Sequence, residues 1–241
     1  MAMNVPDSEP GSDPSVRAVA ALDDELRRRM YAFIRGSATP VTREQVGAAV
    51  GISRKLAAFH LDKLVEVGLL RAEDAPMGGI ARVGRRPKVY QPTDLDVRVA
   101  IPARQHDELA EILIDAVLTQ AAGEHAWHTT LRVAHQRGHD LGTATLERTR
   151  PGRLGADRAL ALADTALRQW GFEPTRPAPS RIRLRNCPFH PLTAKSPELV
   201  CGINHAFLSG FLAGLHASGV EAVLDPAAGE CCVELCAPSV T

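Results

Sequence analysis

The spacing of apolar residues predicts three helices between residues 22 and 68. Thr42 is placed to cap a short second helix over residues 43–50, and Ser53 to cap a third that ends at Gly68. Gly51 permits a tight turn between them, so the segment predicts a helix-turn-helix. The first helix has apolar residues every three or four positions and ends near Gly36: Leu22, Leu26, Met30, Phe33 and Ile34.

The third of these helices has two faces of different chemistry. Ala57, Leu61 and Leu64 share one side of this helix. Lys55, Phe59 and Asp62 therefore project from the other side, flanked by Arg54 and Ala58. The major groove of B-DNA admits one helix, and this second face fits that role. An alternative phase of the helix makes Phe59 a core residue. The candidate DNA-contacting residues are Ser53, Arg54, Lys55, Ala58 and Phe59.

A strand, a basic loop and a second strand follow the third helix. The strands are predicted at residues 69–71 and 88–91, and residues 82–88 hold four positive charges and no negative one. Arginines on a narrow turn suit the minor groove of DNA, whereas the alternative is an ordinary solvated loop. The pattern predicts a wing whose candidate DNA-contacting residues are Arg82, Arg85, Arg86 and Lys88.

The second half of the chain mixes helical and strand patterns. Helices are predicted after Pro102, over residues 124–141 and 156–170, and from Pro197; strands are predicted at 181–185, 220–224 and 232–236. Pro174, Pro177 and Pro179 indicate a linker, and the small residues Gly210 and Gly214 indicate a closely packed helix face. The helix after Pro102 could pair with its copy through an apolar stripe: Leu109, Ile112, Leu113, Ala116 and Val117.

The charge totals conceal a segregation along the chain. Lys and Arg number 28, as do Asp and Glu, but residues 17–104 hold sixteen bases against ten acids, while residues 105–241 hold twelve against fifteen. The expected class is mostly α with small β: a disordered leader over residues 1–16, a winged helix-turn-helix DNA-binding domain over 17–104, and an α+β dimerisation and sensor domain over 105–241. Without a long apolar run or a signal-peptide pattern, a cytoplasmic protein with no membrane partner is expected.

All five cysteines lie in the last quarter of the chain. Cys187 begins a Cys-Pro-Phe-His sequence after a predicted strand, Cys201 lies early in the next helix, and Cys231 and Cys232 begin the last strand. Thiolates from these elements can converge on an iron–sulfur cluster or, with His190 as partner, on zinc. Side chains alternate along a strand, so one of the adjacent pair is expected to ligate, and Cys232 is favoured. Structural thiols and a thiol enzyme using Cys187 and His190 are the alternatives.

Two parts of the sequence resemble known regulators. Gly51-Ile52-Ser53-Arg54, His60-Leu61-Asp62-Lys63-Leu64 and Gly84-Arg85-Arg86-Pro87 make residues 22–92 similar to winged-helix regulators of the ArsR/DeoR type. That resemblance implies sequence-specific binding of a double-stranded DNA operator by a homodimer, without enzymatic activity.

The second half resembles the subgroup that includes the Suf-operon repressors. The matching motifs are Asn186-Cys187-Pro188-Phe189, Pro197-Glu198-Leu199-Val200-Cys201 and Gly229-Glu230-Cys231-Cys232. The resemblance implies a cysteine-bound iron–sulfur cluster whose loss changes DNA affinity. No cysteine lies between Cys201 and Cys231, where the four-cysteine version has one, and His216 stands midway. The fourth ligand is therefore open among His190, His216 and a carboxylate.

Overall fold

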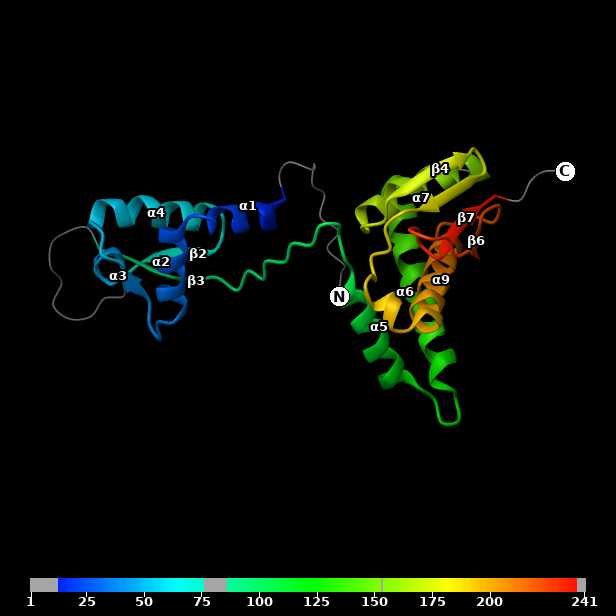
Figure 1. Ribbon diagram of the computed structural model, residues 1–241, viewed down its shortest axis with the longest axis horizontal. Coiled ribbons are helices and arrows are strands. Elements are labelled where there is room, and N and C mark those ends of the chain that lie inside the picture. Colours follow the sequence, from blue (N-terminus) through cyan, green and yellow to red (C-terminus); the bar gives the residue numbers. More distant parts are fainter. Residues whose placement is uncertain (1–12, 76–85, 153, 238–241) are drawn as a thin grey trace. The chain divides into compact units, whose positions relative to one another are not determined.

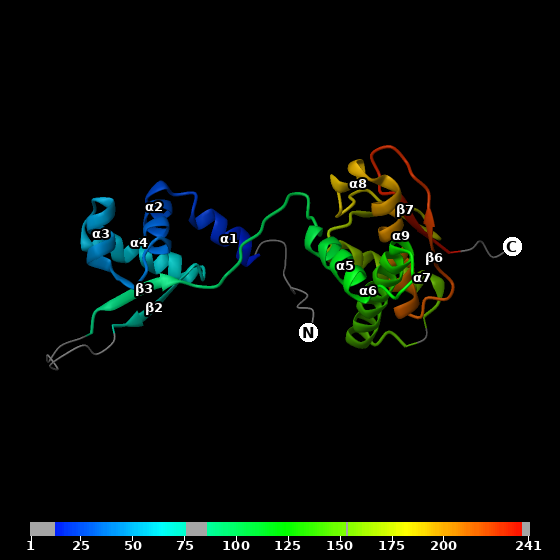
Figure 2. The same cartoon turned by 90° about the horizontal axis from the view of Figure 1, so that it is seen from below.

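The computed structural model divides the chain into two compact units, residues 1–99 and 100–241. It describes residues 13–75, 86–152 and 154–237. The division falls a few residues before the boundary expected from the change in charge. Each unit has its own core of buried apolar side chains, so the two are described in turn (Figures 1 and 2).

The N-terminal unit is a winged helix-turn-helix. The strands form an antiparallel sheet in the order β1-β3-β2, and β2 and β3 make the hairpin of the wing. Residues 76–85 of the intervening loop lie outside the described residues. In chain order the elements are α1 (Pro14–Ala21), α2 (Glu25–Arg35), β1 (Val41–Thr42), α3 (Arg43–Val50), α4 (Arg54–Glu66), β2 (Leu70–Asp74) and β3 (Lys88–Pro92).

Local capping sets the helix boundaries of this unit. The hydroxyl of Thr42 accepts a hydrogen bond from the Gln45 backbone N–H, and the Gln45 side chain accepts one from Thr42, which is a capping box. Gly51 has φ of 78°, so α3 ends in a left-handed residue that glycine adopts without strain. The Ser53 hydroxyl then caps α4 by accepting from the Leu56 N–H at 3.3 Å. The predicted helices and turn are confirmed.

Two features of this unit differ from the sequence prediction. The expected disordered leader is wrong for residues 13–16, because Asp13 caps α1 and the helix begins at Pro14. Residues 1–12 lie outside the described residues. The strand β1 was also not expected, since only two residues pair with β3, Val41 opposite Tyr90 and Thr42 opposite Val89.

The C-terminal unit combines helices with a four-stranded antiparallel sheet. The strand order is β4-β5-β7-β6, so β4 and β6 form its edges. None of the described helices is both long and apolar enough to cross a membrane. In chain order the elements are α5 (His106–Thr119), α6 (Ala126–Thr149), α7 (Ala156–Gln169), β4 (Pro174–Ala178), β5 (Arg181–Leu184), α8 (Leu192–Lys195), α9 (Pro197–Gly214), β6 (Glu221–Leu224) and β7 (Val233–Cys236).

Helices α6 and α9 pack backbone to backbone along their length (Figures 1 and 2). A Cβ added at Gly210 of α9 would overlap the His135 carbonyl of α6, and one at Gly138 of α6 would overlap the Phe207 carbonyl of α9. Gly142 and Gly214 repeat this relation one turn further along. The prediction of a closely packed face at Gly210 and Gly214 is therefore confirmed, and α6 contributes matching glycines.

The prediction of a linker at residues 174–179 is wrong. Pro174 and Pro177 lie in β4, which pairs with β5 on one side only. Proline lacks an N–H donor, so an edge strand is the place in a sheet where it is tolerated. Proline content alone therefore gives the wrong prediction for this strand.

Candidate functional site

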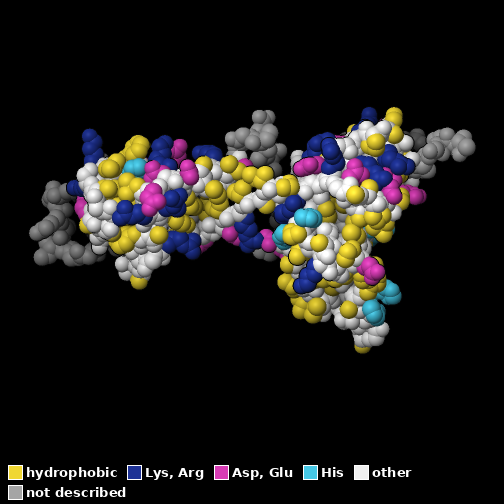
Figure 3. Space-filling model, viewed as in Figure 1, with side chains coloured by type: hydrophobic (Ala, Val, Ile, Leu, Met, Phe, Trp, Pro, Cys, Tyr) yellow, Lys and Arg dark blue, Asp and Glu magenta, His cyan; other side chains and the backbone are white. Residues whose placement is uncertain are grey.

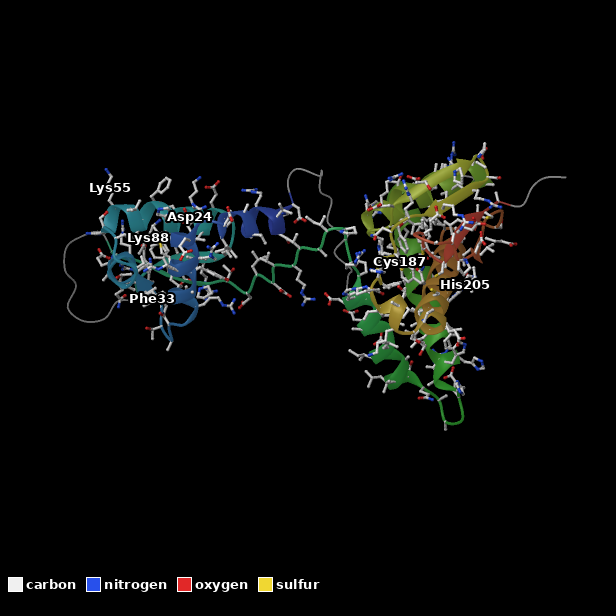
Figure 4. The ribbon with its side chains drawn as sticks, viewed as in Figure 1. Asp24, Phe33, Lys55, Lys88, Cys187 and His205 are labelled. Carbon is white, nitrogen blue, oxygen red and sulfur yellow. The ribbon has the colours of Figure 1, made fainter. Side chains whose placement is uncertain are left out.

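The outer face of α4 presents the side chains predicted to contact DNA. Arg54 and Lys55 occupy the first turn and are exposed, Ala58 is half-buried, and Ser53 is the exposed cap. Lys55 projects away from the unit, and Figure 3 shows Lys and Arg side chains over this region (Figures 3 and 4). Phe59 is 57% exposed, so its alternative assignment to the core is wrong.

Sequence analysis missed one member of this face. Leu56 is 42% exposed and lies three residues before Phe59, so the two form an apolar pair beside Arg54 and Lys55. Their position opposite the buried Ala57 and Leu61 is the signal that could have identified Leu56. Exposed apolar side chains on such a helix can pack against thymine methyl groups.

The guanidinium of Arg54 has a partner within the unit. Its Nε lies 2.6 Å from Oε1 of Glu44 on α3, and both side chains are largely exposed. An exposed ion pair of this kind contributes at most about 1 kcal/mol, so Arg54 can exchange the carboxylate for another partner.

The wing contributes fewer described residues. Arg86 and Lys88 are exposed at the start of β3, where Lys88 pairs with Asp74 of β2 (Figure 4). Arg82 and Arg85 lie outside the described residues, so their predicted role has no structural outcome.

Four cysteines from distant parts of the chain line one cavity of about 400 Å³. Cys187 follows β5, Cys201 lies in the second turn of α9, and Cys231 and Cys232 directly precede β7. All five predicted ligands, including His190, therefore line the same cavity. The full lining is Arg104, Arg185, Asn186, Cys187, His190, Thr193, Cys201, Gly229, Glu230, Cys231 and Cys232.

The Cys187 segment is held by the buried side chain of Asn186. Its amide donates to the backbone carbonyls of Gly171 at 2.5 Å and Ala103 at 3.2 Å, while Arg104 donates to its Oδ1 at 2.5 Å. The turn closes through a 3.1 Å hydrogen bond from the His190 N–H to the Cys187 carbonyl. On the facing segment, the Cys231 N–H donates to Leu184 of β5 at 2.7 Å. Cys231 is thereby anchored to β5, the strand that Cys187 follows in the chain.

The adjacent cysteines both line the cavity, and the expectation that one of them ligates, Cys232 being favoured, stays a prediction. Strand alternation does not apply to them, because β7 begins at Val233 and the pair lies in the preceding turn. Cys231 and Cys232 are both buried.

Mutual contact and burial keep these thiols protonated. The hydrogen bond to Cys231 and then burial raise the pKa of Cys187, and burial raises the pKa of Cys201. The pKa of Cys231 is raised to about 12: the hydrogen bond from Cys187 lowers it, and the bond to Cys232 together with burial outweighs that. A nucleophilic thiolate at neutral pH needs a lowered pKa, so this environment disfavours a thiol enzyme.

The candidates for a fourth ligand lie in two different pockets. His190 and Glu230 line the thiol cavity, whereas His216 lies beyond the C-terminal end of α9 and lines a different pocket with His205 and Glu221. His216 is therefore excluded as a ligand in this arrangement. Glu230 was not named by sequence analysis, although its place next to Cys231 is a signal that could have found it.

The donors surround a space and do not meet at a point. Within the described residues, no group of three or more His, Cys, Asp or Glu side chains is arranged to hold a single metal ion. A tetrahedral zinc ion needs its sulfurs about 2.3 Å from one centre. The cavity lined by Cys187, Cys201, Cys231 and Cys232 therefore has the donor chemistry of a soft metal, but its donors are not arranged around a single ion.

An ion-pair network supports the loop that carries Cys231 and Cys232. Arg183 of β5 forms ion pairs with Asp225, with Glu230 at 3.7 Å, and with Glu234, whose Oε2 lies 2.9 Å from the Arg183 Nε. Glu234 is only 3% exposed. Arg183 thus joins both ends of the segment 225–234, and with it the cavity wall, to the sheet.

Comparison with models of known protein families and with curated proteins finds no family and no protein that matches this chain.

Proposed function

We propose that the chain is a cytoplasmic DNA-binding transcription regulator, acting as a homodimer, whose thiol cavity holds an iron–sulfur cluster that tunes operator affinity. The observation that carries the proposal is the pairing of two features in one chain: the exposed basic and apolar face of α4 and the convergence of four thiols in one cavity. The first fits a DNA reader and the second a metal sensor.

For DNA, the first turn of α4 supplies the reading groups. Arg54 has the geometry for a bidentate contact with guanine, Lys55 for a guanine or a phosphate, and Leu56 and Phe59 for thymine methyl groups. Arg86 and Lys88 at the wing add contacts to the phosphate backbone. This division makes α4 the source of specificity and the wing a source of affinity.

For the sensor, the residues present fit an iron–sulfur cluster better than one zinc ion. Cys187, Cys201, Cys231 and Cys232 supply four thiolates, with His190 as the alternative ligand. Such a cluster supplies redox and oxygen sensitivity when bound. Arg104 and Arg185 line the same cavity, and their positive charges offset the negative charge of thiolate ligands.

The dimer is assigned to α5. Its residues Leu109, Ile112 and Ala116 pack into the core of their own unit, while Val117 and Leu118 are each 76% exposed. Apolar side chains that remain this exposed on a helix mark an interaction surface. A homodimer presents two copies of α4 to the two half-sites of a near-palindromic operator.

The DNA assignment is tested by selection from a pool of random duplexes with the full chain. We expect enrichment of a near-palindromic sequence, and Arg54→Ala to weaken binding about 10- to 100-fold, the range for one base contact. Lys63→Ala is the matched control, because Lys63 lies in the last turn of α4 and pairs with Glu66. Absence of enrichment, or equal loss in both variants, contradicts the DNA assignment.

The sensor assignment is tested by metal and sulfide analysis of protein purified or reconstituted without oxygen. Iron and sulfide with visible absorbance are expected, lost in Cys187→Ser and kept in Cys236→Ser. Cys236 is the matched control because it does not line the cavity and donates to Glu234 at 3.1 Å, a bond that serine preserves. Zinc without sulfide supports a zinc regulator, and metal-free protein supports structural thiols; both contradict the cluster.

A further inference from the structure

Asn204 is a fully buried amide placed against the thiol cavity. It lies on α9 one turn after Cys201, and its Nδ2 donates to the Cys231 sulfur at 3.1 Å. Its Oδ1 has no hydrogen-bond partner among the described residues. The amide contact with the sulfur is therefore its hydrogen bond in the described structure.

This arrangement is costly if Cys231 is only a structural thiol. A neutral thiol sulfur is a weak acceptor, and an unsatisfied buried polar group costs about 1–3 kcal/mol. Hydrogen bonds to a charged acceptor are roughly twice as strong as those between neutral groups. The Nδ2–H group of Asn204 therefore makes a stronger hydrogen bond when the Cys231 sulfur carries the negative charge of a metal ligand.

Hydrogen-bond donors to ligand sulfurs are one of the means by which a protein sets the potential of an iron–sulfur centre. Asn204 is such a donor to the Cys231 sulfur, and because it donates from a side chain it can be substituted.

We infer that Asn204 is a positioning residue of the metal centre: its N–H···S hydrogen bond stabilises the ligand form of Cys231 and so controls how tightly the cluster is held and how readily it is reduced. This inference rests on the proposed cluster. Asn204 acts through Cys231 and makes no bond to the metal itself. Because Cys201 and Asn204 share the same helix, one movement of α9 shifts a ligand and the donor to another ligand together.

The test compares Asn204→Leu and Asn204→Asp in the full chain, reconstituted with iron and sulfide without oxygen. Leucine removes the donor at similar volume, and aspartate keeps the shape but sets a carboxylate against the sulfur. We expect both to bind the cluster at least about tenfold less tightly, the range for loss of an outer hydrogen bond. We also expect a lower reduction potential in both, lowest in the aspartate variant.

Thr145→Val is the matched control for a lost buried polar group. Thr145 is buried on α6 and does not line the thiol cavity, so its substitution leaves cluster retention and potential unchanged. Circular dichroism of each metal-free variant separates loss of fold from loss of cluster.

Three outcomes overturn the inference. If Asn204→Leu retains the cluster as tightly as the wild type and with the same reduction potential, the role of Asn204 is rejected. The proposed cluster is unaffected by that result. Tighter retention in Asn204→Asp, which lacks the N–H donor, shows that the N–H···S bond does not stabilise the cluster and rejects the proposed role. Failure of the wild-type chain and of Cys236→Ser to take up iron and sulfide rejects the proposed cluster, and the inference with it.

Discussion

The two units use their charged side chains in opposite ways. In the N-terminal unit the ion pairs Arg54–Glu44 and Lys63–Glu66 lie at the surface, with every partner at least 46% exposed. In the C-terminal unit Arg183 and Glu234 are 17% and 4% exposed and hold a loop in place. Exposed pairs exchange partners at little cost, whereas buried pairs do not. These two surface pairs of the N-terminal unit are therefore free to exchange partners, whereas Arg183 and Glu234 stabilise the fold of the C-terminal unit.

The largest expected effect on stability comes from removing Arg183, the cation that pairs with the buried carboxylate of Glu234. Arg183→Met leaves the Glu234 carboxylate buried without its main partner, so we expect a loss of about 3–5 kcal/mol in the free energy of unfolding of the C-terminal unit. Both tryptophans, Trp127 and Trp170, lie in that unit. Urea unfolding followed by tryptophan fluorescence therefore measures it separately.

The matched variant for this prediction is Arg183→Met combined with Glu234→Met. Replacing both partners by apolar groups removes the unpaired charge, so most of the lost stability returns. A single variant as stable as the wild type would show that the buried pair is dispensable, and the contrast between the units would collapse.

A smaller loss is expected where two helix backbones meet. Gly210→Ala places a methyl group against the His135 carbonyl, which rigid backbone cannot easily clear, so we expect about 1–3 kcal/mol of destabilisation. Gly219→Ala is the control, since its Cβ makes only ordinary contact at 3.6 Å with Ala156. Equal urea midpoints for the two variants would show that α6 and α9 can separate without penalty.

At the surface, breaking an ion pair changes binding and leaves stability nearly untouched. Glu44→Gln frees Arg54 and removes a negative charge near the DNA-contacting face, so we expect two- to five-fold tighter binding to the selected duplex, about 0.5–1 kcal/mol. Fluorescence anisotropy of labelled DNA measures it, with Glu66→Gln as control. Weaker binding by Glu44→Gln would mean that the carboxylate orients Arg54 and does not compete for it.

The smallest effect concerns an exposed carboxylate between α5 and α6. Hydrogen bonds from Arg132 and from the Ala121 N–H lower the pKa of Glu124 to about 2 from its usual 4.5. A lowered folded-state pKa means that this stabilisation is present above 4.5 and disappears as the pH falls towards 2. The melting temperatures of the wild type and Glu124→Gln should therefore differ by a constant amount above about pH 5 and converge near pH 2. A constant difference throughout contradicts the assignment.

The predictability of the two units differs for a physical reason. The boundaries of α3 and α4 follow from Thr42, Gly51 and Ser53, whose effects act within one turn and can be read from neighbouring residues. In contrast, β1 exists only because residues 41 and 42 pair with β3, nearly fifty positions later. That pairing leaves no local signal in so short a segment.

The same distinction holds for the thiol cavity. Cysteine is a rare residue, so its presence alone identified four candidates, and all four line one cavity: Cys187, Cys201, Cys231 and Cys232. Asn204 and Arg104 are ordinary residues whose importance appears only when α9 and the segment before α5 come together in space. His216 was a reasonable candidate by spacing, but the end of α9 carries it away from the cavity.

The interlocked glycines of α6 and α9 have a mechanical consequence. The backbones of α6 and α9 lie against each other at two successive turns, so we expect a displacement of α9, a helix about 27 Å long, to move α6 with it. Arg137 of α6 in turn forms ion pairs with Glu111 and Asp115 of α5, at 2.8 and 2.7 Å. We therefore expect a shift of Cys201 on α9 to be passed through α6 to α5, the first helix of the C-terminal unit.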